Sequence, residues 1–235
     1  SGDFKTRGDV SKYQHSFRTM VESLNQLMSN ADAGLADVSR MLSAIAAGDM
    51  SQSITAQYRG TFDTLKNDSN LTVERLRSFV DAQKEISRQH ELGMIDYKIP
   101  AESFPGTYRE MAHGINELVG GHIAVKMKIV EVVSRYAIGD LSMDMDRLPG
   151  KKAQITKAMD AVKASLQSIN KDVEDLVNAA ASGNFTTRGD AAKYQHSFRT
   201  MIESLNKLMQ TADAGLSDVS RVLSALATGD LDQTI

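Results

Sequence analysis

The stretch Thr6–Met28 reads TRGDVSKYQHSFRTMVESLNQLM, and it returns almost unchanged at Thr187–Met209 as TRGDAAKYQHSFRTMIESLNKLM. The similarity extends further, because residues 1–54 align on residues 182–235 without a gap and with roughly 39 identical positions. Most differences are conservative, such as Val21 against Ile202. A chain that repeats a segment of this length is built from units, so the intervening residues should contain further copies.

A short glycine signature recurs along the whole chain at intervals of about 45 residues, a period typical of helical repeats. The signature begins at Gly2, Gly48, Gly93, Gly139, Gly183 and Gly229. A second anchor follows at His15, Gly60, Gly106, Gly150 and His196, and an amide or acid lies ten residues beyond each anchor, at Asn25, Asn70, Asn116, Asp160 and Asn206. The two near-identical stretches are therefore the first and fifth units of one series.

The distances between these anchors separate helix from connector. The distance from the amide or acid to the next glycine is the same five times, whereas the distance from the glycine to the second anchor varies by a residue or two. One residue added to a helix rotates everything beyond it by about 100°, so the constant segment predicts one uninterrupted helix of about 33 residues. The variable segment, which contains Pro100, Pro105 and Pro149, predicts a connector of about 13 residues. The predicted fold class is all-α.

The predicted helices carry an apolar seam with steps of three and four residues, as in bundles and coiled coils. Polar residues weaken the centre of the second seam. A single helix of this kind cannot bury its seam alone, so it needs neighbouring units or a partner chain. The first seam comprises Phe17, Met20, Leu24, Leu27, Ala31, Leu35, Val38, Leu42 and Ile45, and the second comprises Phe62, Leu65, Ser69, Thr72, Leu76, Phe79, Gln83 and Ile86.

Composition and motifs exclude several classes of function. The net charge of -3, with acids and bases mixed throughout, lacks the basic stripe of a nucleic-acid-binding protein. The absence of cysteine excludes disulfides and thiolate metal sites. No apolar run approaches the ~20 residues of a membrane span, and no signal peptide is recognised. No nucleophile–base constellation, phosphate loop or paired-carboxylate motif is present, so neither an enzyme nor a cofactor is predicted.

Apolar residues stand two and six positions after the glycine in most connectors. An exposed loop needs no such spacing, so we predict that the connector lies along a helix pair and is held by two apolar side chains, the first and second pins. The first and second pins are Met50 and Ile54, Ile95 and Ile99, Leu141 and Met145, and Leu231 and Ile235, whereas the other two connectors have Phe4 or Phe185 first and Gly8 or Gly189 second.

This arrangement of helix, glycine, two spaced pins, second glycine and a helix with Asn about ten residues in resembles the HAMP domain of bacterial chemoreceptors and sensor kinases. The resemblance covers essentially the whole chain, which looks like a tandem HAMP array of a methyl-accepting chemotaxis protein or a similar transducer. The chain departs from the family pattern in lacking the acidic pair before the second glycine, and His15 and His196 replace that glycine in two units. The predicted units are 30–76, 77–121, 122–166 and 167–211, flanked by partial units 1–29 and 212–235.

The resemblance implies parallel four-helix bundles formed by two chains, in which signals pass between input and output modules by helix repacking. The implied partners are a second copy in a parallel homodimer and, through regions outside this chain, a histidine kinase and an adaptor. The implied location is the cytoplasm, including the cytoplasmic part of a membrane receptor. The residues alone leave an antiparallel bundle open, because long helices with such connectors could fold back on themselves.

Two other functions stay open, namely a helical sensor bundle that binds a small ligand or haem, and a passive coiled-coil spacer. The histidines bear on the first of these, because a haem could use a His–Met axial pair. No two of them have the i, i+4 spacing of a helical metal site, so we favour junction or surface roles. The five histidines are His15, His90, His113, His122 and His196.

Overall fold

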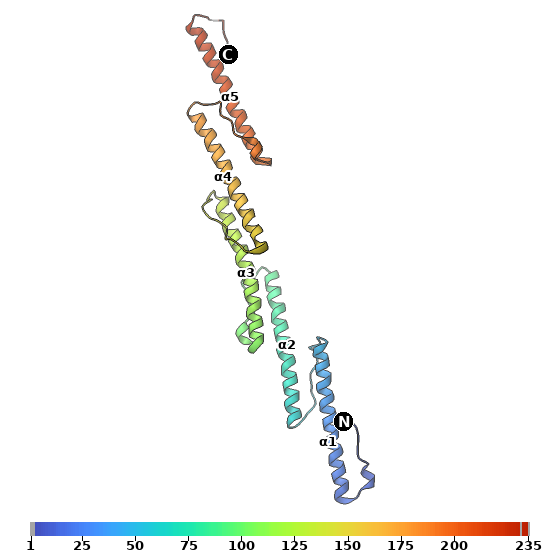
Figure 1. Cartoon of the computed structure of the whole chain (residues 1–235). Coiled ribbons are helices and arrows are strands. Elements are labelled where there is room, and N and C mark those ends of the chain that lie inside the picture. The colour runs from blue at the N-terminus through green and yellow to red at the C-terminus, as the bar shows by residue number, and fades with distance from the viewer. Residues whose placement is uncertain (1–2, 231, 235) are drawn as a thin grey trace. The chain divides into compact units, whose positions relative to one another are not determined.

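The computed structural model describes residues 3–230 and 232–234, which form helices and connecting segments without β-strands. Within these residues the prediction of an all-α chain of long helices is confirmed, since the helices contain 32, 31, 32, 29 and 32 residues. The helices are α1 (His15–Ala46), α2 (Thr61–Glu91), α3 (Gly106–Ala137), α4 (Ala153–Ala181) and α5 (His196–Ala227) (Figure 1). Short 3₁₀ turns lie in the connectors at Val10–Lys12, Ala101–Ser103, Gly150–Lys152 and Ala191–Lys193.

The signature glycines end the helices in the left-handed region of backbone conformation. After α1, the Gly48 N–H donates to the Ile45 carbonyl at 2.9 Å and the Asp49 N–H donates to the Ala44 carbonyl at 2.8 Å. These two bonds form a Schellman motif, which requires a positive φ that glycine adopts without strain. The values of φ are 77° for Gly48, 86° for Gly93, 81° for Gly139, 80° for Gly183 and 85° for Gly229. The first signature glycine, Gly2, lies outside the described residues.

The chain divides into two compact units, Ser1–Ala124 and Val125–Ile235, and the division falls inside α3. Each unit contains two clusters of buried apolar side chains, and every cluster joins two successive helices with the connector between them. In the first unit these clusters centre on Met41, Ile54 and Val73, and on Ile86, Ile99 and Ala112. In the second unit they centre on Val132, Met145 and Met159, and on Ile169, Tyr194 and Ile202.

Helices α1, α2 and α3 run in the same direction within the first unit (Figure 1). A Cβ added to Gly34 of α1 would lie 2.6 Å from the ring of Phe62, at the start of α2, whereas Met41 shares a cluster with Val73, further along α2. The contact positions thus advance together along both helices. The antiparallel bundle that the sequence left open is wrong for these helices, because each connector runs back along the previous helix to about its middle, where the next helix starts in the same direction (Figure 1).

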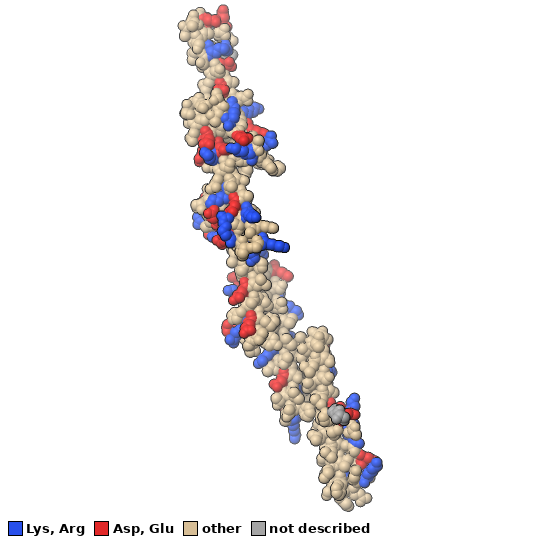
Figure 2. Space-filling view, viewed as in Figure 1, with Lys and Arg blue, Asp and Glu red and all other residues tan. Residues whose placement is uncertain are grey.

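Most of the predicted seam of α1 stays on the surface of the single chain, but Ala31 is buried, and Val38 and Ile45 are half-buried against the cluster of Met41, Ile54 and Val73. Phe17, Met20 and Leu27 are 67%, 57% and 62% exposed, and the face of α1 that is buried within the chain carries Gly34 and Met41. Figure 2 shows broad uncharged areas over α1 and α2. Helix α1 therefore has one apolar face covered within the chain and a second apolar face left open, as expected for a helix that also needs a partner.

Charged side chains of both signs are interspersed on the visible faces of the two units (Figure 2). In the second unit, Lys163 of α4 pairs with Asp144 of the connector of residues 139–150 at 2.7 Å. Among residues 3–230 and 232–234, no helix combines the length and the apolar character needed to cross a bilayer.

Candidate functional site: the connector clamp

An asparagine on the following helix holds the connector through both polar atoms of its side chain. The Asn116 side-chain oxygen accepts a hydrogen bond from the Ile99 N–H at 2.9 Å, and its nitrogen donates to the Ile99 carbonyl at 2.8 Å. An amide suits this task because it presents an acceptor and a donor side by side. We call this pair of bonds the connector clamp. It recurs between Asn25 and Gly8, Asn70 and Ile54, and Asn206 and Gly189.

The clamp acts on the residue that occupies the second-pin position. Ile54, Ile99 and Met145 are only 2–3% exposed, and each lies in the cluster of its own helix pair. The first pins are placed less deeply, since Met50, Leu141, Phe4 and Phe185 are half-buried and Ile95 is exposed. Leu231 and Ile235 lie outside the described residues. That these side chains hold the connector stays a prediction. Because the second pins are more deeply buried, we expect them to contribute more to docking of the connector than the first pins do.

The second anchor begins the following helix in the left-handed region. Gly60, Gly106 and Gly150 have φ of 61°, 50° and 57°, and His15 and His196 both have φ of 48°. The two histidines therefore adopt the backbone conformation of the glycine they replace. A non-glycine residue in this conformation costs roughly 1–2 kcal/mol, so these positions are strained.

The other histidines lie at separate places on the surface. His90 Nε2 is 3.0 Å from the Tyr97 carbonyl, and His113 Nε2 is 3.1 Å from a Glu102 carboxylate oxygen. His122 lies exposed on α3. Among the residues that the structure describes, no three His, Cys, Asp or Glu side chains gather as a metal ion would require.

The end of the connector is also tied to the preceding helix. The Tyr58 hydroxyl donates to Asp37 of α1 at 2.7 Å, and the Tyr194 hydroxyl donates to Asp172 of α4 at 2.9 Å. Burial, and then the bond to Asp37, raises the pKa of Tyr58. In the connector of residues 93–106, Phe104 takes this place and packs edge-on against Phe79 of α2, with ring centroids 5.7 Å apart. The connector thus bridges the two helices that it joins.

The connector of residues 139–150 departs from the asparagine pattern. Asp160 stands at the amide position, and it pairs with Arg147 of the connector instead of bonding to the backbone. The buried hydroxyl of Thr156 takes over, since it accepts from the Leu148 N–H at 3.2 Å and donates to the Asp146 carbonyl at 2.7 Å. A hydroxyl can do both because one oxygen is donor and acceptor.

The first residues of the connector form a polar turn. The Asp140 carboxylate accepts bonds from the Ser142 hydroxyl at 2.6 Å and the Ser142 N–H at 3.0 Å, and Arg135 of α3 donates to it at 2.9 Å. These bonds, with those of Ser142 the strongest, lower the pKa of Asp140 to about 2. Asp49 makes the same two bonds with Ser51, and its pKa is also lowered.

Spacing in the sequence singled out the asparagines but not their bonding. Their constant offset of ten residues from the second anchor, and the recurrence of a side chain that both donates and accepts, were the available signals. The partner of Asn116 lies 17 positions earlier, on a connector of variable length. The role of Thr156 had no signal, because its position is occupied by unrelated residue types in the other units.

Parallel helix pairs, each bridged by a connector that bonds to the following helix, define a repeated helix–connector–helix module. Three family models match successive segments of this chain. They are the HAMP domain at residues 12–78, the second HAMP domain of methyl-accepting chemotaxis protein McpB at residues 73–121, and HAMP N-terminal domain 3 at residues 125–167. The chain belongs to the HAMP family and carries its domains in tandem.

A curated relative supports the same assignment. Over 116 residues, which are 47% of this chain, it is 45% identical to methyl-accepting chemotaxis protein McpB of Pseudomonas aeruginosa. The match covers 17% of that protein, so the present chain spans only a small part of its relative. The similarity therefore describes the HAMP region and not a whole receptor.

Proposed function

We propose that this chain is a signal-relay region of a longer chemoreceptor-like protein, passing conformational change from an input module to an output module. The observation that carries the proposal is the exposed apolar seam of α1, a helix that runs unbroken from the predicted unit 1–29 into the unit 30–76. A seam of this length requires a partner. The parallel order of α1, α2 and α3 favours a second copy in parallel register, which would complete four-helix bundles.

The same proposal includes where the units begin and what they contact. We place the complete units at 30–76, 77–121, 122–166 and 167–211, and each holds one of the four buried clusters. The chemotaxis name of the relative favours a cytoplasmic location and a downstream histidine kinase and adaptor, contacted by regions outside these residues. It also favours a role without catalysis or nucleic-acid binding.

The proposed mechanism is helix repacking. A relay needs two packings of similar free energy, and a signal shifts their balance only by its different affinity for the two. The continuous helices transmit the phase of one unit to the next. Inserting one residue between Asn70 and Gly93 rotates the downstream part of the helix by about 100°, whereas inserting seven leaves a drift of only about 20°.

The test is this pair of insertions in the full-length protein, read by downstream kinase activity. We expect the one-residue insertion to lock or abolish the output and the seven-residue insertion to largely preserve it. A passive coiled-coil spacer would tolerate both. Equal outputs from the two insertions would therefore contradict the relay.

Assembly is tested separately by light scattering at micromolar concentration. A homodimer has twice the 25.6 kDa mass of the chain. Crosslinking through Leu27→Cys, with the exposed Glu22→Cys as the control, should join the copies only at the seam. A monomer at high concentration would contradict the dimer, and with it the proposed bundle.

A sensor bundle is a second candidate, favoured by one feature of the second unit. An open hollow of about 310 Å³ is lined mainly by apolar side chains, including Tyr136, Leu166, Ile169 and Met201. A small apolar ligand would fit such a volume. An absorbance scan of the purified protein would reveal haem, and native mass spectrometry would reveal another bound molecule. A protein without bound molecules that still responds to the insertions would exclude this candidate as the source of the relay signal.

A further inference from the structure

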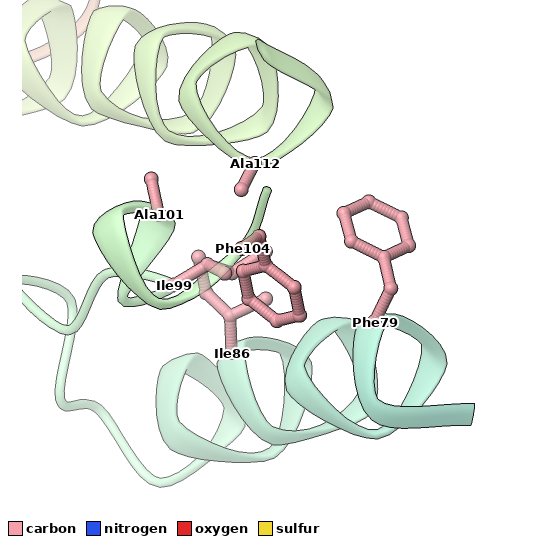
Figure 3. Packing of buried hydrophobic residues seen from close by; sticks show 6 residues of the cluster. All are labelled: Phe79, Ile86, Ile99, Ala101, Phe104 and Ala112. Carbon is pink, nitrogen blue, oxygen red and sulfur yellow. The ribbon is translucent and has the colours of Figure 1, made fainter. Parts of the chain in front are cut away.

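In three units the second-pin position packs against the residue of the following helix that lies four positions before the clamping asparagine. In the unit of residues 77–121 the two positions hold Ile99 and Ala112, which are 2% and 0% exposed and pack in one cluster (Figure 3). The large side chain comes from the connector, and the helix offers only a methyl group. This division of volume suits an Ile pin, because a larger residue at 112 would compete for the same space.

In the unit of residues 167–211 the division of volume is reversed. The second-pin position is Gly189, and the helix position is Ile202, which is completely buried. A Cβ added to Gly189 would lie 2.9 Å from Ile202 Cγ2 and 3.3 Å from Leu176 Cδ1. The first copy repeats this arrangement, since a Cβ on Gly8 would lie 2.7 Å from Val21 Cγ1.

Backbone conformation does not explain these two glycines. The residues with positive φ include eight other glycines, but neither Gly8 nor Gly189. Any residue could therefore adopt the backbone there. The space occupied by Val21, or by Ile202 together with Leu176, requires glycine, so the apparent loss of a pin on the connector is matched by a branched side chain on the following helix.

We propose that the second-pin position and the helix residue opposite it form a volume lock that determines which connector fits on which helix. Ile202 and Val21 act in it as positioning residues that replace the missing pins. Ile99 with Ala112 follows the opposite division of volume. Where the second pin is Met145 or Ile54, the corresponding helix positions hold Thr156, which bonds to the connector backbone, and Lys66, whose ammonium group bonds to Asp63 at 2.7 Å. The lock concerns docking within the chain and does not depend on the relay function.

The first test asks whether Gly189→Ala speeds hydrogen exchange in the natural chain but slows it in a chain that already carries Ile202→Ala. We would follow amide hydrogen exchange of residues 184–195 in the full chain for Gly189→Ala, Ile202→Ala and the double variant. Gly189→Ala alone should speed exchange about threefold or more, and Ile202→Ala about tenfold or more, because the first crowds the site and the second empties it. Added to Ile202→Ala, the same Gly189→Ala change should slow exchange.

The sign reversal separates the lock from a general effect of glycine. Replacing glycine by alanine restricts the unfolded chain equally in both backgrounds, so that effect cannot reverse. The connector of residues 94–105 is the internal control and should keep its exchange rate in all three variants. If Gly189→Ala acts in the same direction in both backgrounds, the lock does not exist.

The second test transplants the reversed lock into the unit of residues 77–121. Ile99→Gly and Ala112→Ile should each speed exchange of residues 94–105 about tenfold or more, and the double variant should return to within about threefold of the natural chain. Ile95→Gly combined with Ala112→Ile is the mismatched control and should give no recovery, since Ile95 is 41% exposed. A transplanted pair that is no better than the mismatched pair would overturn the proposal.

Discussion

The connectors of residues 93–106 and 139–150 both bury their second pin almost completely, yet they are held by different bonds. Asn116 grips both backbone groups of Ile99 itself. In the other connector the Thr156 hydroxyl bonds to the Leu148 N–H and the Asp146 carbonyl. These two residues follow the second pin, Met145, which Thr156 does not bond. A neutral amide thus binds the connector in one unit and a hydroxyl binds it in the other. Asp160, which corresponds to Asn116, forms an ion pair with Arg147.

The difference follows the length of the connector. Between its two left-handed glycines the connector 139–150 has two residues fewer than the connector 93–106. The shorter connector places the Leu148 N–H and the Asp146 carbonyl beside α4, and the hydroxyl of Thr156, one helical turn before Asp160, bonds to them. The site therefore requires a donor and an acceptor for the connector backbone, because buried peptide groups must be paired, but it does not require one fixed residue type.

The largest expected effect comes from the buried pin that the two connectors share. Met145→Ala should weaken docking of the connector 139–150 by about 2–4 kcal/mol, because it empties a core position. Leu141→Ala, at the half-buried first pin, should cost about 1 kcal/mol. Hydrogen exchange of residues 140–149 measures both. Equal effects of the two substitutions would show that burial does not rank the pins.

Removing the clamp in the unit of residues 77–121 should have the next largest effect. Asn116→Leu leaves the Ile99 N–H and carbonyl without their partners, and we expect the connector to open more easily by about 2–3 kcal/mol. Asn116→Asp should cost less, because a carboxylate can accept from the N–H but cannot donate to the carbonyl. Exchange of residues 94–105 measures the loss. Asn67→Leu, on the exposed face of α2, is the control and should leave this connector unchanged.

The helices, their lengths and their glycine ends were predictable from spacing alone. A fixed distance over five copies identifies a helix, since insertions there would rotate its apolar face, and Gly48 or Gly93 at the end follows from the left-handed cap. The direction of packing was not predictable. Parallel and antiparallel pairs bury the same stripe, and only contacts such as that between Phe62 and Gly34 decide between them.

The candidate site was predictable only in part. Apolar spacing in the connectors pointed to Ile54, Ile99 and Met145, because isolated apolar residues in a loop favour burial. The glycines at 8 and 189 read as missing pins, because sequence does not show which helix residue lies opposite a connector. The clamp partners were also out of reach, since a bond between residues 17 positions apart depends on how the connector crosses the helix.

Thr156→Val removes the hydroxyl that holds the shorter connector, that of residues 139–150. The change keeps the volume but leaves the Leu148 N–H and the Asp146 carbonyl unpaired, so docking should weaken by about 1–2 kcal/mol. Arg147→Met removes only the ion pair with Asp160, whose side chains are 70% and 40% exposed, and should weaken docking less than Thr156→Val does. Exchange of residues 140–149 ranks the two. A larger loss from Arg147→Met would mean that the ion pair, and not the hydroxyl, holds this connector.

The smallest expected effect is that acid should destabilise the connector of residues 139–150 more than the connector of residues 93–106. Asp140 has its pKa lowered from 3.8 to about 2 by Ser142 and Arg135, and the corresponding position of the other connector is Met94. A carboxyl whose folded pKa is depressed contributes stability that is complete above about pH 4 and is lost as the pH falls through about 2. Asp144, whose pKa is lowered by Lys163, acts in the same direction.

Between about pH 5 and pH 2, the protection of residues 140–149 should therefore fall relative to that of residues 94–105, after correction for intrinsic exchange. Asp140→Asn should reduce this fall without changing the connector 93–106, and an equal fall in both connectors would show that acid acts on the helices and not on the turn that Asp140 closes.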